Sequence, residues 1–143
     1  NAAATGPFHV GRKTIEMTDT SRRGWVVSDD DARRVVCDIW YPASKAGEKR
    51  APFVTEDVLN AVLEEFGLPK LLFRHIAASR MSATEAAPLL EGDWPLVIFS
   101  HSLSGVRGQN SGLLQDLASH GFLVVSIDHP YDAILVLFED GFK

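Results

Sequence analysis

The chain has 143 residues, which is enough for one domain of ordinary size and too few for two. Apolar residues make up 45% of it and charged residues 23%, the balance of a folded globular protein. Its net charge of -5 disfavours a nucleic-acid partner or an anionic membrane surface. No apolar stretch reaches the about 18 residues that a membrane-spanning helix needs, so we expect no membrane span.

Cys37 is the single cysteine, so it cannot form an internal disulfide. It lies in the apolar run 35–40 and is expected to be a buried structural thiol. The five histidines are scattered without the spacing of a metal site, and neither a metal nor an organic cofactor is implied. No signal peptide is visible, and the chain begins at Asn1 rather than Met. The compartment therefore stays open, with a secreted or periplasmic location slightly favoured over a cytoplasmic one.

The front of the chain is expected to form antiparallel strands. Residues 9–18 are predicted to be an edge strand, and the β-branched and aromatic run 33–41 a second strand that stops at Pro42. Residues 19–31 between them are rich in Asp, Ser and Gly, which is typical of a turn or a long hairpin connection.

Residues 55–80 are predicted to form a helical pair inserted before the next strand. Apolar side chains recur on one helix face over 58–66, with Thr55 at the N-cap position and Gly67 beyond the last turn. A second helix is expected over 69–76. Covering the sheet is the simpler role for this insertion, and forming a lid or the wall of an acyl pocket is the more specific one.

Two apolar runs, 95–99 and 123–127, flank a helix-like segment at 109–119. Strand, helix and strand at this spacing predict a βαβ unit whose strands are parallel neighbours. Strands that are apolar on both faces are typical of a sheet covered by helices on both sides. Together with the antiparallel front end, this pattern predicts an α/β fold with a mixed sheet.

The loop at 100–105, Ser-His-Ser-Leu-Ser-Gly, follows the first apolar strand, where open α/β sheets bind ligands. It resembles Gly-x-Ser-x-Gly with the small residues Ser100 and Ser104 in place of the two glycines, which would make Ser102 a nucleophile. However, glycines recur through the following residues, which suits a loop better than the helix that such a serine starts. No histidine follows Asp132 either, so an acid-then-histidine order cannot be completed. We therefore expect a nucleophile other than Ser102. The residues expected to line a pocket here are His101, Ser102, Asp128 and His129.

Several motifs together indicate a family. They are the runs at 95–105 and 117–130, above all Leu-Ala-Ser-His-Gly-Phe from Leu117, and Thr-Gly-Pro-Phe-His-Val-Gly, Asp-Thr-Ser-Arg and Trp-Tyr-Pro-Ala nearer the start. In these motifs the chain resembles the plasma platelet-activating-factor acetylhydrolase family. Bacterial lipases, cutinases and dienelactone-hydrolase-like esterases are more distantly similar. The resemblance implies an α/β-hydrolase fold and cleavage of a lipid, short-chain or polymeric ester by a Ser-His-Asp mechanism.

The resemblance also assigns a role within the loop. The family has Ser-His-Gly-Leu-Gly there, and its leucine donates a backbone N–H to the oxyanion hole, which corresponds to Leu103. This chain has Ser102 and Ser104 where the family prefers glycine. If glycine serves to allow a positive φ, Ser102 would be strained or the loop reshaped.

The resemblance spans only the first half of the family's fold. Residues 1–143 would thus be the N-terminal part of a single hydrolase domain, with the nucleophile, acid and base outside this chain. We expect the strand at 123–127 to have an unpaired edge, and the C-terminal remainder to complete the sheet as a second chain. Two alternatives stay open: an acyl-transferring or cyclising enzyme on the same fold, and a non-catalytic hydrolase-derived binding module.

Overall fold

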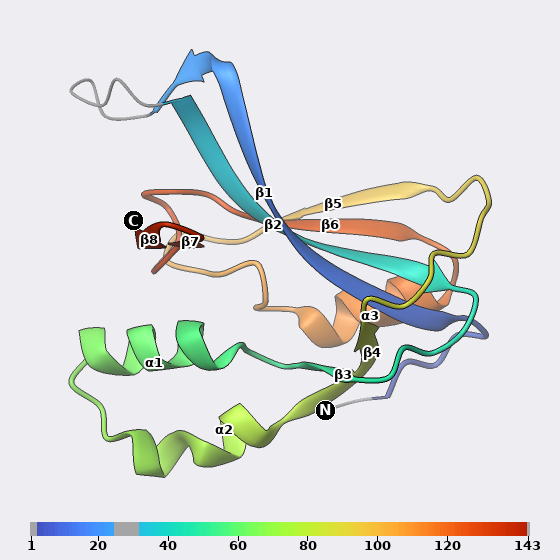
Figure 1. The fold of residues 1–143 in the computed structure, drawn as a ribbon, viewed down its shortest axis with the longest axis horizontal. Coiled ribbons are helices and arrows are strands. Elements are labelled where there is room, and N and C mark those ends of the chain that lie inside the picture. Colours follow the sequence, from blue (N-terminus) through green and yellow to red (C-terminus); the bar gives the residue numbers. More distant parts are fainter. Residues whose placement is uncertain (1–2, 25–31, 143) are drawn as a thin grey trace.

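The computed structural model describes residues 3–24 and 32–142, and Figure 1 shows how the elements are arranged. The main sheet has the strand order β3-β4-β1-β2-β6-β5. Its strands are β1 (His9–Arg23), β2 (Ala32–Ala43), β3 (Arg50–Pro52), β4 (Arg80–Glu85), β5 (Leu96–Ser100) and β6 (Leu123–Asp128). The remaining elements are α1 (Glu56–Glu65), the 3-10 helix η1 (Lys70–Phe73), α2 (Arg74–Ala78), α3 (Ser111–Ser119) and the small hairpin of β7 (Leu137–Phe138) and β8 (Gly141–Phe142).

The predicted βαβ unit is confirmed. β5 and β6 pair in parallel over five residue pairs, from Leu96 opposite Leu123 to Ser100 opposite Ile127, and α3 connects them. β6 also pairs with β2, and β2 with β1, both antiparallel, so the sheet is mixed as expected. Because parallel strands end at the same edge of a sheet, the loops after β5 and β6 lie side by side.

The expected position of the free edge is wrong. β6 lies between β2 and β5 and is paired on both sides, whereas β5 is the last strand of the sheet. The crossover through α3 places β6, the later strand, between β2 and β5. Local sequence patterns do not reveal this strand order. On β5, Leu96 and Ile98 are 58% and 63% exposed.

Only one face of the sheet is covered by helices in the described part of the chain. Helix α3 packs there against Trp40 and Val124, with Leu114 and Ala118 in the same buried cluster. In Figure 1 the α1–α2 pair lies on the same side as α3. The expectation of helices on both faces is therefore not met by the described residues. On the opposite face, every second side chain of β5 is exposed and every second side chain of β6 is partly exposed.

The front end follows the prediction with two differences. β1 continues to Arg23, into the expected turn, and residues 25–31 of that turn lie outside the described residues. β1 is not an edge strand either, because Gly11 and Arg12 pair with β4, which the sequence analysis did not predict. None of the described helices is long and apolar enough to cross a membrane.

The helical pair at 55–80 forms close to its expected bounds. Thr55 occupies the N-cap position of α1, where its carbonyl accepts the Leu59 N–H at 3.0 Å although its hydroxyl makes no capping bond. Gly67, with φ +62°, follows the end of α1, a conformation in which glycine has little steric cost. The second helix is η1 followed by α2 rather than one continuous helix.

Candidate active site

The chain leaves β5 through a tight turn over residues 102–105. The Gly105 N–H donates to the Ser102 carbonyl at 2.8 Å, and Ser104 has φ +59°. A positive φ at the third position is the feature for which type II turns favour glycine. Ser102 is not among the described residues with positive φ. Of the two serines that replace the family's glycines, Ser104 is therefore the one whose backbone adopts the conformation that favours glycine.

Three backbone N–H groups follow Ser102 in this turn, and two of them are engaged. The Ser104 N–H donates to the Asp132 carbonyl at 2.7 Å, and the Gly105 N–H to Ser102. Within residues 3–24 and 32–142, nothing accepts a hydrogen bond from the Leu103 N–H. The Leu103 side chain is 79% exposed. The turn therefore presents one free donor at the carboxyl edge of the sheet.

The turn forms one wall of an open cleft of about 450 Å³. Its lining residues are Arg33, Val35, Ser100, His101, Leu103, His129, Pro130 and Asp132. Three of the residues predicted from the sequence, His101, Leu103 and His129, thus come together here.

His101 connects the two loops at this edge. Its Nδ1 is 2.8 Å from the Ser102 carbonyl oxygen, and its Nε2 is 3.1 Å from the His129 backbone nitrogen. A carbonyl can only accept and an N–H can only donate, so Nδ1 carries the proton and Nε2 accepts. The ring is buried and packs edge-on against the His129 ring, with centroids 5.3 Å apart.

The serine that contacts a histidine is Ser100 rather than Ser102. Ser100 Oγ lies 2.8 Å from His129 Nε2. No carboxylate among the described residues bonds the other nitrogen of His129, so these two residues lack the acid that completes a triad. Sequence reasoning missed Ser100, although both residues stand where neighbouring parallel strands end.

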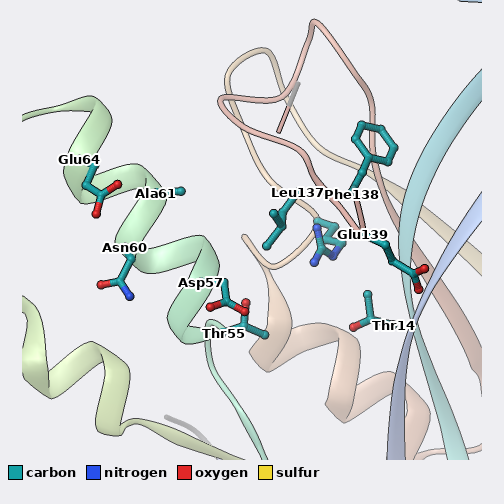
Figure 2. Close-up of a pocket in the computed structure, with 10 residues that line it drawn as sticks. Thr14, Thr55, Asp57, Asn60, Ala61, Glu64, Leu137, Phe138 and Glu139 are labelled. Atoms are coloured by element: carbon teal, nitrogen blue, oxygen red, sulfur yellow. The ribbon is translucent and has the colours of Figure 1, made fainter. Parts of the chain in front are cut away.

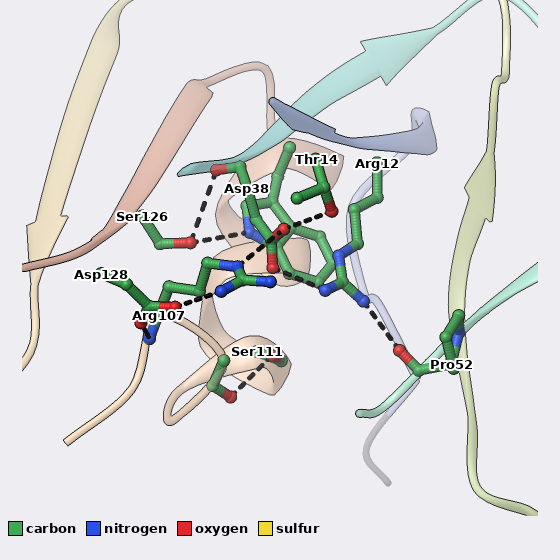
Figure 3. Close-up of polar contacts among 10 residues, drawn as sticks. Arg12, Thr14, Asp38, Pro52, Arg107, Ser111, Ser126 and Asp128 are labelled. Atoms are coloured by element: carbon green, nitrogen blue, oxygen red, sulfur yellow. Dashed lines mark hydrogen bonds and ion pairs between the residues drawn. The ribbon is translucent and has the colours of Figure 1, made fainter. Parts of the chain in front are cut away.

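Asp128 lies on the inner face of the sheet, away from the cleft. Its buried carboxylate accepts the Arg107 backbone N–H at 2.5 Å and pairs with the Arg107 guanidinium (Figure 3). Burial raises the pKa of Asp128, and the charge of Arg107 opposes this rise. Because Arg107 follows the 102–105 turn closely, these contacts fix the far end of the loop against β6.

A second buried carboxylate, Asp38 of β2, extends this network. It accepts hydrogen bonds from Arg12 at 2.5 Å and Thr14 at 2.6 Å, and Arg107 Nε lies 3.2 Å away without hydrogen-bond alignment. Figure 3 shows Asp38 between the two guanidinium groups. Burial acts to lower the pKa of Arg107, but Asp38 and Asp128 together raise it above the ordinary value. Two cations and two carboxylates thus balance inside the fold, an arrangement that the sequence analysis did not anticipate.

Two further cavities lie on the α1 side of the sheet. One of about 240 Å³ is bounded by this charged network and by apolar side chains of α1, including Val58, Leu59 and Val62. The other, about 520 Å³ and open, lies between α1 and the β7 segment (Figure 2). None of the pocket residues predicted from the sequence lines this second cavity. Across the described ranges, no group of three or more His, Cys, Asp or Glu side chains could hold a metal ion.

Comparison with known proteins gives consistent matches. A family model described as platelet-activating factor acetylhydrolase, isoform II, matches residues 2–137. Platelet-activating factor acetylhydrolase of Cavia porcellus is 32% identical over 97 residues, which cover 64% of this chain and 22% of that protein. A probable 1-alkyl-2-acetylglycerophosphocholine esterase of Arthroderma benhamiae is 29% identical over 157 residues, covering 96% and 38%.

Among solved structures, the ferulic acid esterase from Streptomyces cinnamoneus superposes with a TM-score of 0.82 at 31% identity. The match covers 98% of this chain and 38% of that structure. The described sheet and helices thus have an α/β-hydrolase-like fold. The chain spans less than two-fifths of the length of each of these relatives.

Proposed function

Because the chain belongs to the platelet-activating factor acetylhydrolase, isoform II family, we propose that it is the N-terminal part of a serine-type carboxylic ester hydrolase. In this proposal the Leu103 N–H stabilises the oxyanion that forms when the ester carbonyl is attacked. The nucleophile, acid and base come from residues outside this chain. No metal or organic cofactor takes part in this chemistry.

The free Leu103 N–H carries the proposal. Leu103 stands at the carboxyl edge of the sheet and lines the cleft, and its N–H is the one donor of the 102–105 turn that no described group uses. A backbone donor fixed before reaction does not need to reorganise as negative charge develops, and one such donor typically lowers the barrier by about 3 kcal/mol. The engaged N–H groups of Ser104 and Gly105 keep the surrounding turn in place.

The edge position of β5 suggests where the nucleophile enters. A further parallel strand beside β5 would end at the same edge of the sheet, next to Leu103. We propose that the C-terminal remainder supplies this strand and the catalytic serine, either as a continuation of the polypeptide or as a second chain. The serine attacks the carbonyl, and a histidine takes its proton and returns it to the leaving group.

The substrate class is proposed from the relatives and from the cavity of about 240 Å³ beside α1. Their names describe esterases of an acetylated ether glycerophospholipid and of ferulic acid. The cavity beside α1 is lined by apolar side chains, among them Val58, Leu59 and Val62, so α1 could form the wall of an acyl pocket. We therefore propose a lipid, short-chain or polymeric ester, hydrolysed by water.

Deleting the donor itself tests the proposal. Proline suits the second position of such turns and has no N–H, so Leu103→Pro in the complete protein removes the donor while leaving the turn possible. With p-nitrophenyl acetate we expect kcat to fall by about 100-fold or more and KM to change little. The matched control, Leu103→Ala, keeps the N–H and should stay within about threefold of the unmodified enzyme.

A labelling experiment separates this proposal from its alternatives. A fluorophosphonate probe should modify a serine outside residues 1–143, and recovery of the label on Ser100 or Ser102 would overturn the assignment. A complete protein that neither reacts with the probe nor cleaves esters would be a binding module. Transfer of the acyl group to an added alcohol in preference to water would identify an acyltransferase.

A further inference from the structure

We infer that His101 is a positioning residue: its ring fixes the peptide plane between Ser102 and Leu103 and so directs the Leu103 N–H into the cleft. This inference rests on the proposed function, because it concerns the donor assigned there. His101 itself is not required to touch the substrate.

The argument begins with the geometry of one peptide unit. The Ser102 carbonyl and the Leu103 N–H belong to the same planar group, and in a trans peptide they point in opposite directions. The structure has no cis peptide bond among its described residues. Whatever holds the Ser102 oxygen therefore sets the direction of the Leu103 N–H.

Two donors hold that oxygen. His101 Nδ1 lies 2.8 Å from it on one side, and the Gly105 N–H donates to it at 2.8 Å from within the turn. Glycine is needed at 105, because a Cβ there would lie 2.8 Å from the Ser102 oxygen and 2.9 Å from His101 Cβ. Hydrogen bonds to a carbonyl also polarise the peptide, which makes its N–H a stronger donor.

The His101 ring is itself fixed, so it can act as a rigid support. Its Nε2 accepts the His129 backbone N–H at 3.1 Å, and its edge packs on the His129 ring. The first contact joins the end of β6 to the loop after β5 through one imidazole. The same contact selects the tautomer, because an Nε2 that accepts leaves Nδ1 as the protonated nitrogen.

Two substitutions of His101 distinguish the role of Nδ1 from the role of Nε2. Asparagine can place its amide near the position of Nδ1 and keep a donor for the Ser102 oxygen, whereas glutamine can replace Nε2 and keep only the bond to His129. In the complete enzyme with p-nitrophenyl acetate, we expect His101→Gln to lower kcat about tenfold or more at nearly constant KM. We expect His101→Asn to keep kcat within about threefold, although it loses the bond between the two loops. His120→Gln and His120→Asn serve as controls, since His120 lies at the end of α3.

A purely structural role predicts a different result. In that case both His101 variants would lose activity in proportion to their loss of thermal stability, and this outcome would overturn the inference. Equal activity of the two variants, at any level, would overturn it as well. An inactive unmodified enzyme would instead contradict the proposed function, so the two failures are distinguishable.

A measurement on the unmodified protein covers the case in which neither variant folds. In ¹⁵N NMR of the histidine side chains, His101 should show a protonated Nδ1 and an unprotonated Nε2 at neutral pH. The opposite tautomer would mean that Nδ1 cannot donate to the Ser102 oxygen, and the inference would be wrong.

Discussion

At the scale of single residues, Arg107 has the strongest testable effect on stability. Replacing it by leucine leaves the buried Asp128 carboxylate without its cation, while Asp38 keeps Arg12 and Thr14. Breaking one side of a buried ion pair typically costs about 3 kcal/mol or more. We expect a loss of this size for Arg107→Leu at neutral pH, measured by denaturant unfolding of the complete protein.

The loss should depend on pH in a defined direction. Burial already raises the pKa of Asp128, and without the Arg107 side chain only the backbone N–H of residue 107 still opposes that rise. A carboxyl whose pKa is raised in the folded state stabilises the fold below its unfolded pKa of about 3.9 and loses that contribution as pH increases. The penalty of Arg107→Leu should therefore be smaller near about pH 4 than near about pH 7. The exposed Lys70–Glu64 pair supplies the control, Lys70→Leu, and an equal penalty at both pH values would contradict the prediction.

At the scale of elements, the helical pair divides into a packed part and an exposed part. Leu63 of α1 is 3% exposed, whereas Leu71 and Leu72 of η1 are 71% and 66% exposed. Leu63→Ala should cost about 2–4 kcal/mol because it leaves a cavity, while Leu71→Ala and Leu72→Ala should each change stability by about 0.5 kcal/mol or less. Thermal melts of the complete protein check this. Comparable losses at all three positions would mean that another part of the protein covers η1.

At the scale of the whole molecule, the prediction concerns the free edge at β5. Leu96 and Ile98 are exposed on this apolar edge strand, and such an edge invites pairing with another strand. If the remainder of the protein covers β5, Leu96→Lys together with Ile98→Lys should strongly destabilise the complete protein, because two charges would be buried without partners. Leu71→Lys together with Leu72→Lys is the matched control and should have little effect.

The isolated chain offers the complementary test. Residues 1–143 expressed alone should self-associate through β5, and co-expression with the remainder should restore a discrete complex on size-exclusion chromatography. A soluble monomer with a cooperative melt and no companion polypeptide would contradict the need for a second part. The binding-module alternative would then become the better explanation.

The elements whose signals are local can be predicted from the sequence alone. Periodic apolar residues predicted α1 and α3, and apolar runs predicted β5 and β6 as parallel neighbours. The buried state of Cys37 followed from the apolar run around it, and in the structure burial raises the pKa of its thiol to about 11. The helices and strands can be predicted because the period of their apolar residues shows within a short stretch of sequence. The pairing of β5 with β6 can be predicted because strands that follow one another in the chain are usually neighbours in the sheet.

The features that depend on distant partners are set by the folding of the whole chain. The free edge belongs to β5 because β6 was inserted between β5 and β2, and no local pattern encodes that order. The positive φ falls on Ser104, whose N–H donates to the carbonyl of Asp132 from another loop. The pairing of Asp38 and Asp128 with Arg107 joins residues up to 90 positions apart along the chain in a sheet interior where unpaired charges are costly. The direction of the Leu103 N–H likewise depends on a histidine held by the neighbouring strand, so it is set by packing rather than by the loop sequence alone.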